Sequence, residues 1–286
     1  GNDRSPEERE KGGTSRNLQA RAWRFAYLSG ACAIGEEYGV CNTFRSLNDF
    51  ELSEYGITKK EFLRFTEKLP DAGQPFRPAV IALPSSEKMP VLETDISDDY
   101  LECPVSDQSF PAPAGRSGKI RSVMNGVFGV KGRFGNNSHV MTNGGLPELF
   151  DIVNADSLTD KSGYGYVVDL SFGDLPSSIP GKRIAPDELM PLLSSELPCV
   201  IDGNAHIMYN RIDGGWIVSM FNNDGISCDA FEGDRQLHEA DISFDMTLNG
   251  DRSVEIIDGG GSLSRDGMIC HIELEAGQWL IIRLGQ

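Results

Sequence analysis

The chain has 286 residues, of which 39% are hydrophobic and 24% charged, the balance of an ordinary globular protein. Its 43 acidic residues outnumber the 26 lysines and arginines and give a net charge of −17 at pH 7. Such a charge repels phosphates and anionic lipids, so it disfavours nucleic acid, a membrane surface and strongly acidic substrates as partners. Neutral ligands such as sugars are compatible with it.

The sequence shows no signature of a metal, a cofactor or a membrane span. Its six cysteines have no C-x-x-C or zinc-type spacing, and Cys32, Cys199 and Cys270 lie in apolar runs typical of buried free thiols. No apolar run reaches the roughly 18–20 residues that cross a bilayer. We therefore expect no metal, no cofactor and no membrane partner, and the sequence assigns no cellular compartment.

The N-terminal quarter is predicted to be helical after a mobile lead-in. Residues 1–16 are charged, contain glycine and lack periodicity. Apolar residues then recur with helical spacing over 17–33. A second helix is predicted over 57–70, where Thr58 and Glu61 form a capping box and a terminal proline stops the helix.

The middle of the chain alternates predicted strands and helices. Short apolar or β-branched runs predict strands at 77–84, 139–143 and 164–170, and helical patterns are found at 146–153 and 185–193. This order is typical of a doubly wound parallel sheet. No G-x-G-x-x-G follows a strand, so the sequence gives no dinucleotide-binding signature.

The last third is predicted to be all-β. Residues 206–211 and 215–221 form two strands joined by an Asp-Gly turn, the strongest short-range hairpin signal. Four more short strands, punctuated by glycine and aspartate, are expected at 241–248, 252–257, 268–275 and 278–284. A small β-sandwich is the expected architecture.

Three passages resemble the C-terminal region of large bacterial glycoside hydrolases of the beta-galactosidase type. Residues 23–40, with Glu36 and Glu37 between two glycines, resemble the last helix-to-strand step of a (β/α)8 barrel. Residues 75–84 are similar to the strand that opens the second domain of such enzymes, and 200–225 to the junction of their second and third domains.

The resemblance implies a fold class of α/β plus all-β. A partial (β/α) barrel segment would precede a flavodoxin-like, or glutamine-amidotransferase-like, doubly wound sheet, which a small β-sandwich would follow. The boundaries expected are a lead-in at 1–16, a barrel-end segment at 17–74, an α/β domain at 75–200 and a β-rich domain at 201–286. A complete barrel needs about 250 residues, so the main catalytic carboxylates are expected outside this chain.

The candidate site lies in the turn after the first helix. Glu36 and Glu37 are the candidate catalytic residues, although adjacent strand residues point to opposite sides, so at most one faces a ligand. Tyr38 would stack on a sugar, and Asn42 or Arg45 would bond its hydroxyls. The alternative is that the two carboxylates cap or salt-bridge a surface loop.

A second candidate is Asn143, in the turn 142–145. An amidotransferase would place its nucleophilic cysteine at such a strand-to-helix turn, and this chain has none there, which disfavours thiol acyl transfer. The glycine pair that follows could cradle a polar ligand. The alternative is a plain tight turn.

Two hypotheses of function follow from these features. In the first, the chain is the C-terminal portion of a carbohydrate-active glycoside hydrolase that binds a neutral carbohydrate. In the second, it is a non-catalytic carbohydrate-binding or oligomerisation module, and the chain forms a homo-oligomer.

Overall fold

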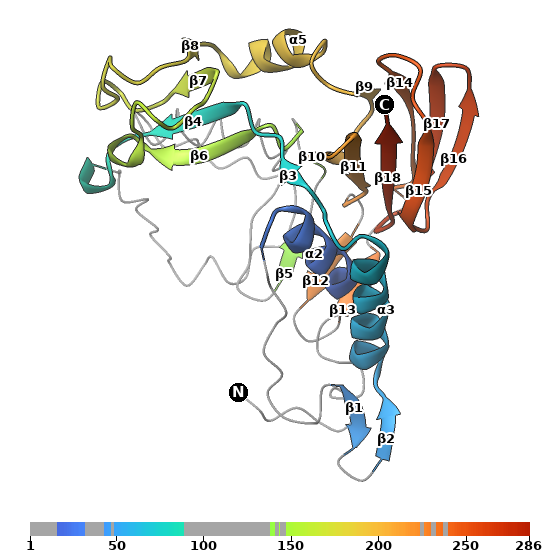
Figure 1. Ribbon diagram of the computed structural model, residues 1–286. Helices are drawn as coiled ribbons and strands as arrows, with labels where there is room; N and C mark the ends of the chain where they lie inside the picture. The colour runs from blue at the N-terminus through green and yellow to red at the C-terminus, as the bar shows by residue number, and fades with distance from the viewer. Residues whose placement is uncertain are drawn as a thin grey trace.

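A computed structural model describes residues 16–31, 43–46, 49–88, 138–140, 143, 147–223, 226–229, 233–236 and 240–286. Nearly all of the predicted lead-in lies outside these residues. Across the described part the protein combines helices, one parallel sheet and several antiparallel sheets (Figure 1). It is therefore a mixed α/β and β protein, as the sequence predicts in general terms.

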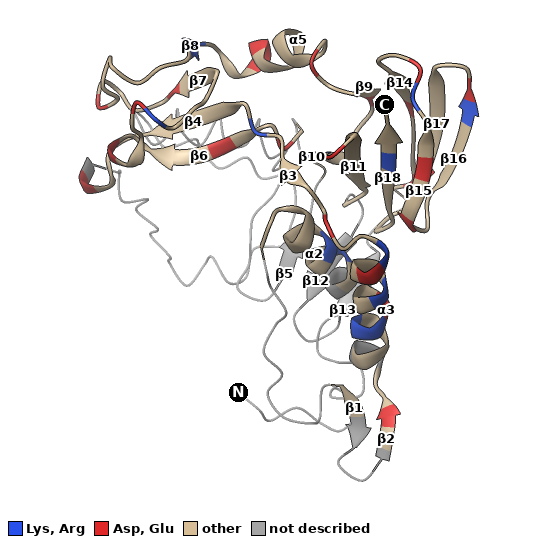
Figure 2. Cartoon of the chain, viewed as in Figure 1, with Lys and Arg blue, Asp and Glu red and all other residues tan. Residues whose placement is uncertain are grey.

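Two helices, α2 (Arg16–Leu28) and α3 (Glu54–Lys68), form the N-terminal layer. The predicted capping box at Thr58 is wrong, because α3 begins one turn earlier. Its N-cap is Ser53, whose hydroxyl accepts a bond from the amide of Gly56 at 3.1 Å. The helix ends before Pro70, as predicted. Its charged residues, coloured in Figure 2, include the exposed Lys60 and Arg64.

The central sheet is antiparallel, with strand order β15-β18-β11-β10-β3. Its Asp-Gly hairpin is confirmed, since Ile212 pairs with Gly215 and Gly214 takes φ +73°. The strands are β3 (Gln74–Pro75), β10 (His206–Ile212), β11 (Gly215–Phe221), β15 (Val254–Gly259) and β18 (Trp279–Gly285).

The outer sheet is also antiparallel, with strand order β16-β17-β14-β9. Its middle strands alternate between buried and exposed residues, so one face is covered and one is wet. The edge strand β16 was not predicted, because its sequence SLSRD has no apolar alternation. The strands are β9 (Cys199–Asp202), β14 (Ile242–Leu248), β16 (Ser262–Asp266) and β17 (Ile269–Leu274).

The parallel sheet has strand order β6-β4-β7-β8. Two predictions for it are wrong. The predicted helix 146–153 is largely strand β6, which pairs along its length with β4. The predicted strand 139–143 lies elsewhere, since β5 pairs with β12. The strands are β4 (Ala79–Leu83), β6 (Phe150–Asn154), β7 (Tyr166–Asp169) and β8 (Lys182–Arg183).

The remaining elements are short. The predicted helix at 185–193 is present as a 3-10 turn followed by one helical turn. A third antiparallel sheet joins β5, β12 and β13, and a separate two-stranded ribbon joins β1 and β2. These elements are β1 (Phe44–Ser46), β2 (Asp49–Leu52), η1 (Ser86–Lys88), β5 (Ser138–Val140), η3 (Ala155–Ser157), η4 (Pro186–Glu188), α5 (Leu189–Leu193), β12 (Ile226–Asp229) and β13 (Gly233–Gln236).

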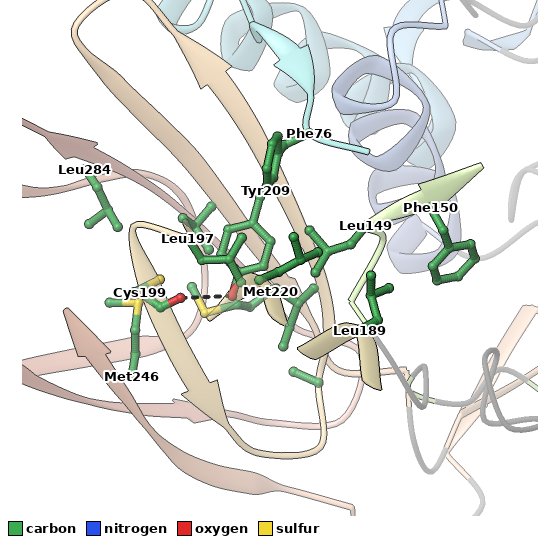
Figure 3. Packing of buried hydrophobic residues seen from close by; sticks show 14 of the residues in the cluster. Phe76, Leu149, Phe150, Leu189, Leu197, Cys199, Tyr209, Met220, Met246 and Leu284 are labelled. Carbon is green, nitrogen blue, oxygen red and sulfur yellow. Dashed lines mark hydrogen bonds between the residues drawn. The ribbon is translucent and has the colours of Figure 1, made fainter. Parts of the chain in front are cut away.

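The central sheet is buried on both faces, which explains its nearly continuous apolar strands. On one face, Val218, Leu280 and Ile282 pack with the outer sheet, the parallel sheet and α5 in the cluster drawn in Figure 3. On the other face, Ile217 and Ile281 pack against α2 and α3. The central sheet is therefore the layer on which the other described layers assemble.

Cys199 of β9 and Cys270 of β17 are free and buried in the first cluster, as predicted. Burial raises the pKa of the Cys199 thiol to about 12. Because the thiolate is the reactive form of cysteine, this thiol is a packing group and not a nucleophile.

Candidate functional site

Few of the site residues predicted from the sequence have side chains that the structure describes. Glu36, Glu37, Tyr38 and Asn42 lie outside the described residues. Arg45 lies in strand β1, whose backbone alone is described at that position. The roles assigned to these five residues stay predictions.

Asn143 is the exception, because its contacts are described. Its side-chain amide donates bonds to the carbonyl oxygen of Asn204 at 2.5 Å and to Oδ1 of Asn222 at 3.1 Å. Its own Oδ1 accepts a bond from the amide of Asn223 at 2.6 Å. Arg21 of α2 donates to Asn223 Oδ1 at 3.1 Å. The buried amide thus ties its segment to the ends of strands in the central sheet and to α2.

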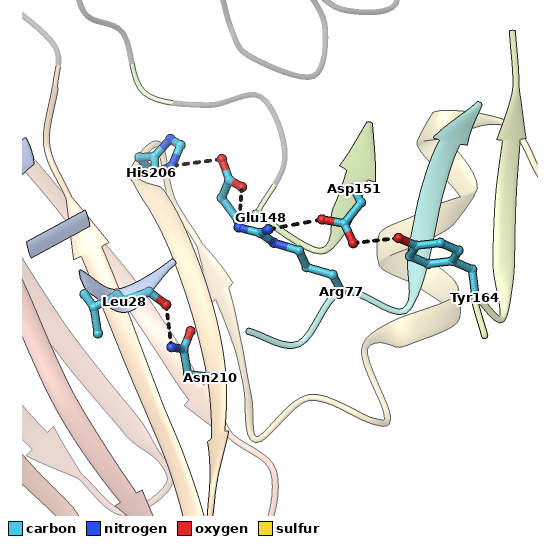
Figure 4. A network of polar contacts seen from close by, with 7 residues as sticks. All are labelled: Leu28, Arg77, Glu148, Asp151, Tyr164, His206 and Asn210. Carbon is cyan, nitrogen blue, oxygen red and sulfur yellow. Dashed lines mark hydrogen bonds and ion pairs between the residues drawn. The ribbon is translucent and has the colours of Figure 1, made fainter. Parts of the chain in front are cut away.

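A larger polar network lies at the amino ends of β4 and β6 (Figure 4). Arg77, just before β4, donates to Asp151 of β6 at 3.0 Å and lies 3.7 Å from Glu148. Glu148 also lies 3.3 Å from Nε2 of His206, the first residue of β10. Tyr164 donates its hydroxyl proton to Asp151 at 2.9 Å. The network therefore joins the parallel sheet to the central sheet.

The pKa shift within this network is consistent with a structural contact between two sheets. Burial, followed by the bond to Asp151, raises the pKa of Tyr164 to about 12, so its hydroxyl stays a donor over a wide pH range. Open α/β sheets bind ligands at the opposite edge, where the carboxyl ends of the strands meet. We therefore assign the Arg77 network to holding two sheets together.

At the carboxyl edge of the parallel sheet, two carboxylates of the protein accept bonds from the segment that follows β4. Asp174 accepts a bond from the amide of Ser85 at 3.1 Å. Asp156 accepts bonds from the amide of Ser86 at 3.2 Å and from its hydroxyl at 2.5 Å. The hydroxyl bond holds the pKa of Asp156 below its usual range. These donors would otherwise be the ones available to an anionic ligand.

The turn after β7 contains Phe172 at φ +56°, the one non-glycine residue with a positive φ in the described part of the chain. A nucleophile elbow places its serine or cysteine on such a strained turn. Here phenylalanine occupies the strained position. The preceding Ser171 is buried, donates its hydroxyl to Asp169 at 2.6 Å and accepts from the amide of Leu175 at 2.9 Å. The turn therefore presents no nucleophile.

A shallow cleft of about 390 Å³ lies at the ends of β14 and β17 in the outer sheet. Three carboxylates line it and no lysine or arginine does, so it repels anions. Each carboxylate accepts a hydrogen bond from a neighbouring residue. Glu273, for example, accepts one from the hydroxyl of Ser262 at 3.1 Å. The lining residues are Asp241, Ile242, Ser243, Gly260, Ser262, Glu273, Leu274, Glu275 and Gln278.

The sequence matches no protein-family model and no curated protein. Within the described residues, no three His, Cys, Asp or Glu side chains are grouped so as to hold a metal ion. No described helix is long and apolar enough to span a bilayer.

The Arg77 network was not predicted from the sequence. Two of its members, Glu148 and Asp151, lie in the segment predicted as a helix, which separates them from the parallel sheet. Predicting 150–154 as a strand would have brought the amino ends of β4 and β6 together and indicated a contact with Arg77. His206 gave no such signal, because its approach to Glu148 depends on the packing of two sheets.

Proposed function

We propose that this chain is the C-terminal portion of a glycoside hydrolase that acts on a neutral carbohydrate. The observation that carries the proposal is the order of the parallel sheet. Its strands run second, first, third and fourth in chain order, the start of the flavodoxin-like arrangement. Two packed antiparallel sheets follow it in the chain. A flavodoxin-like domain before a small sandwich is the architecture that the resemblance implies.

In this proposal α2 and the turn after it are the end of a (β/α) barrel. Of Glu36 and Glu37, which follow α2 in the sequence, one contacts the glycan, with Tyr38 as a stacking surface. The main catalytic carboxylates belong to the rest of the barrel. The parallel sheet serves as scaffold, which agrees with a carboxyl edge at which Asp156 and Asp174 bond to the protein's own serines and a strained turn without a nucleophile.

Because the main catalytic carboxylates belong to the rest of the barrel, the test is hydrolysis of a panel of nitrophenyl glycosides by the enzyme in which this chain is joined to that barrel, and by its variants. We expect turnover, and at least about a hundredfold loss in either Glu36→Gln or Glu37→Gln, because a neutral amide cannot serve as an acid or base. Glu67→Gln, at an exposed position of α3, is the matched control and should retain full activity. Turnover that survives in both variants would contradict the assignment.

The second candidate is a non-catalytic module that binds carbohydrate or assembles the protein. It is favoured by the described carboxyl edge, where Asp156 and Asp174 bond to the protein's own serines, which is an arrangement suited to a scaffold or interface. Sedimentation velocity and glycan binding distinguish the two. Binding or self-association without turnover of any glycoside supports the module, and turnover abolished by a glutamate variant rules it out.

A further inference from the structure

The ribbon of β1 and β2 is an isolated element of the described structure. Its two strands pair with each other and with no other described strand. Figure 1 shows it extending beyond the start of α3, away from the central, outer and parallel sheets. A lone two-stranded ribbon is marginally stable in water, so its persistence needs an anchor.

That anchor lies at the base of the ribbon. The amide of Ser53, the N-cap of α3, donates to the carbonyl oxygen of Thr43 at 2.9 Å. Gly56 in the first turn of α3 lies so close to the same carbonyl that a Cβ there would collide with it. The base of the ribbon is therefore clamped against the start of α3, and the ribbon has a fixed direction.

The ribbon presents aromatic surface to solvent. Phe50 is 76% exposed, by far the largest exposure of any large apolar residue described. Its ring meets that of Phe44 edge to face, with centroids 5.5 Å apart and an interplanar angle of 82°. This pairing fixes the Phe50 ring and leaves most of its surface uncovered. A preorganised aromatic surface of this kind lowers the entropy cost of binding.

We propose that Phe50, supported by Phe44, is a stacking platform for a pyranose ring of a neutral glycan. The inference rests on the proposed carbohydrate function and names a further residue that would contact the glycan. The apolar C–H face of a pyranose packs on an aromatic ring, while its hydroxyls need polar partners.

Charge supports a neutral glycan over other occupants. With a net charge of −17 the chain repels phosphorylated or highly acidic ligands. A second copy of the chain carries the same charge, and the ribbon offers two phenylalanines rather than the broad apolar area of a stable homodimer. A sugar ring needs only a surface about the size of one aromatic side chain.

The experiment is affinity electrophoresis of the full chain in gels that contain soluble galactan, xylan or glucomannan. We expect at least one polysaccharide to retard the wild type. Phe50→Ala should bind that polysaccharide about three- to tenfold more weakly, the usual worth of one aromatic contact. Phe50→Tyr keeps the ring and should bind like the wild type. Leu63→Ala, at a 41% exposed position of α3, is the control and should change nothing.

The outcomes separate this inference from the proposed function. Retardation of the wild type that Phe50→Ala retains overturns the platform and leaves a carbohydrate function standing. No retardation of the wild type in any gel overturns both. Sedimentation velocity completes the test, because self-association of the wild type that Phe50→Ala abolishes would make the ribbon a protein interface and contradict the platform.

Discussion

Two arginines hold neighbouring layers against the central sheet, and they differ in burial. Arg24 of α2 donates through Nε to Asp258 of β15 at 2.5 Å, and its guanidinium lies 4.6 Å from the ring centroid of Trp279. Trp279 donates to the same carboxylate at 2.8 Å. The side chains of Arg24 and Asp258 are 4% and 18% exposed. At the other junction, Arg77 pairs with Asp151 within the parallel sheet, and these side chains are 24% and 33% exposed. Glu148 and His206, which make the contact to the central sheet, are each 15% exposed.

This difference in burial predicts different energetic roles. A buried charge that loses its partner stays desolvated, and the penalty is large, whereas a partly exposed charge regains water. The junction between α2 and the central sheet should therefore behave as part of one folding unit. The junction between the parallel sheet and the central sheet should tolerate the loss of one contact.

Arg24→Leu should produce the largest effect. The change leaves the Asp258 carboxylate with Trp279 as its hydrogen-bond donor among the described residues, and we expect the free energy of unfolding in urea to fall by about 3–5 kcal/mol. The matched change at the other junction, Arg77→Leu, should cost about 1–2 kcal/mol. Arg64→Leu on the exposed face of α3 is the control and should cost less than about 0.5 kcal/mol.

Equal losses for Arg24→Leu and Arg77→Leu would contradict the contrast between the junctions. A separate unfolding transition in Arg24→Leu would also be informative, because it would show α2 and α3 leaving the central sheet before the sheet itself unfolds. Monitoring tryptophan fluorescence is suitable, since Trp279 lies at the junction and Trp23 lies in the same apolar cluster.

The two junctions also show what sequence patterns capture. The hairpin of β10 and β11 was predicted because its turn and alternation are local. The strand β6 was predicted as a helix because Pro147 fits a first helical turn and the apolar residues fit either period. Its pairing with β4, about seventy residues earlier, decides the outcome. Arg24 and Asp258 are 234 positions apart, so no spacing rule connects them.

For the candidate site, the sequence indicated which residue types are present but not how they are arranged in space. Asn143 was selected for its place in a glycine-containing turn, and the structure shows its amide bonded to three protein groups. The aromatic ribbon was missed because residues 41–56 show no regular apolar pattern and were predicted to be irregular. Only the exposed fraction of Phe50 reveals it, and burial is a property of the folded chain.

An intermediate effect is expected at Tyr164, within the Arg77 junction. Its pKa is raised from 10.0 to about 12, so the folded protein keeps this proton at pH values where the unfolded chain loses it. The stabilisation is complete below about pH 10 and is lost as the pH rises toward 12. Tyr164→Phe should cost about 1 kcal/mol at neutral pH, from the lost bond to Asp151.

Urea unfolding of Tyr164→Phe and the wild type at rising pH tests the direction of this pH dependence. The stability gap between the two proteins should narrow between about pH 10 and 12, because the wild type loses its advantage there. Tyr166→Phe is the matched control, since the Tyr166 hydroxyl has no hydrogen-bond partner among the described residues. A gap that is constant or widens would contradict the role assigned to the Tyr164 hydroxyl.

The smallest effect is expected at the far edge of the parallel sheet. Asp156 is exposed, so its bonds to Ser86 compete with water, and Asp156→Asn should lower the urea midpoint only slightly at neutral pH. The bond from the Ser86 hydroxyl lowers the pKa of Asp156 from 3.8. Its contribution is therefore present above about pH 4 and is lost as the pH falls further.

The urea midpoints of the wild type and Asp156→Asn should accordingly converge as the pH falls. The pH dependence is therefore opposite to that of Tyr164, where the stabilities converge as the pH rises. Asp160→Asn, an exposed change in the following loop, is the control and should match the wild type throughout. A loss at neutral pH as large as that of Arg77→Leu would show that the carboxyl edge, and not the Arg77 junction, holds the parallel sheet in place. The burial of a charged side chain, which separates Arg24 from Arg77, would then no longer predict how much its contact contributes to stability.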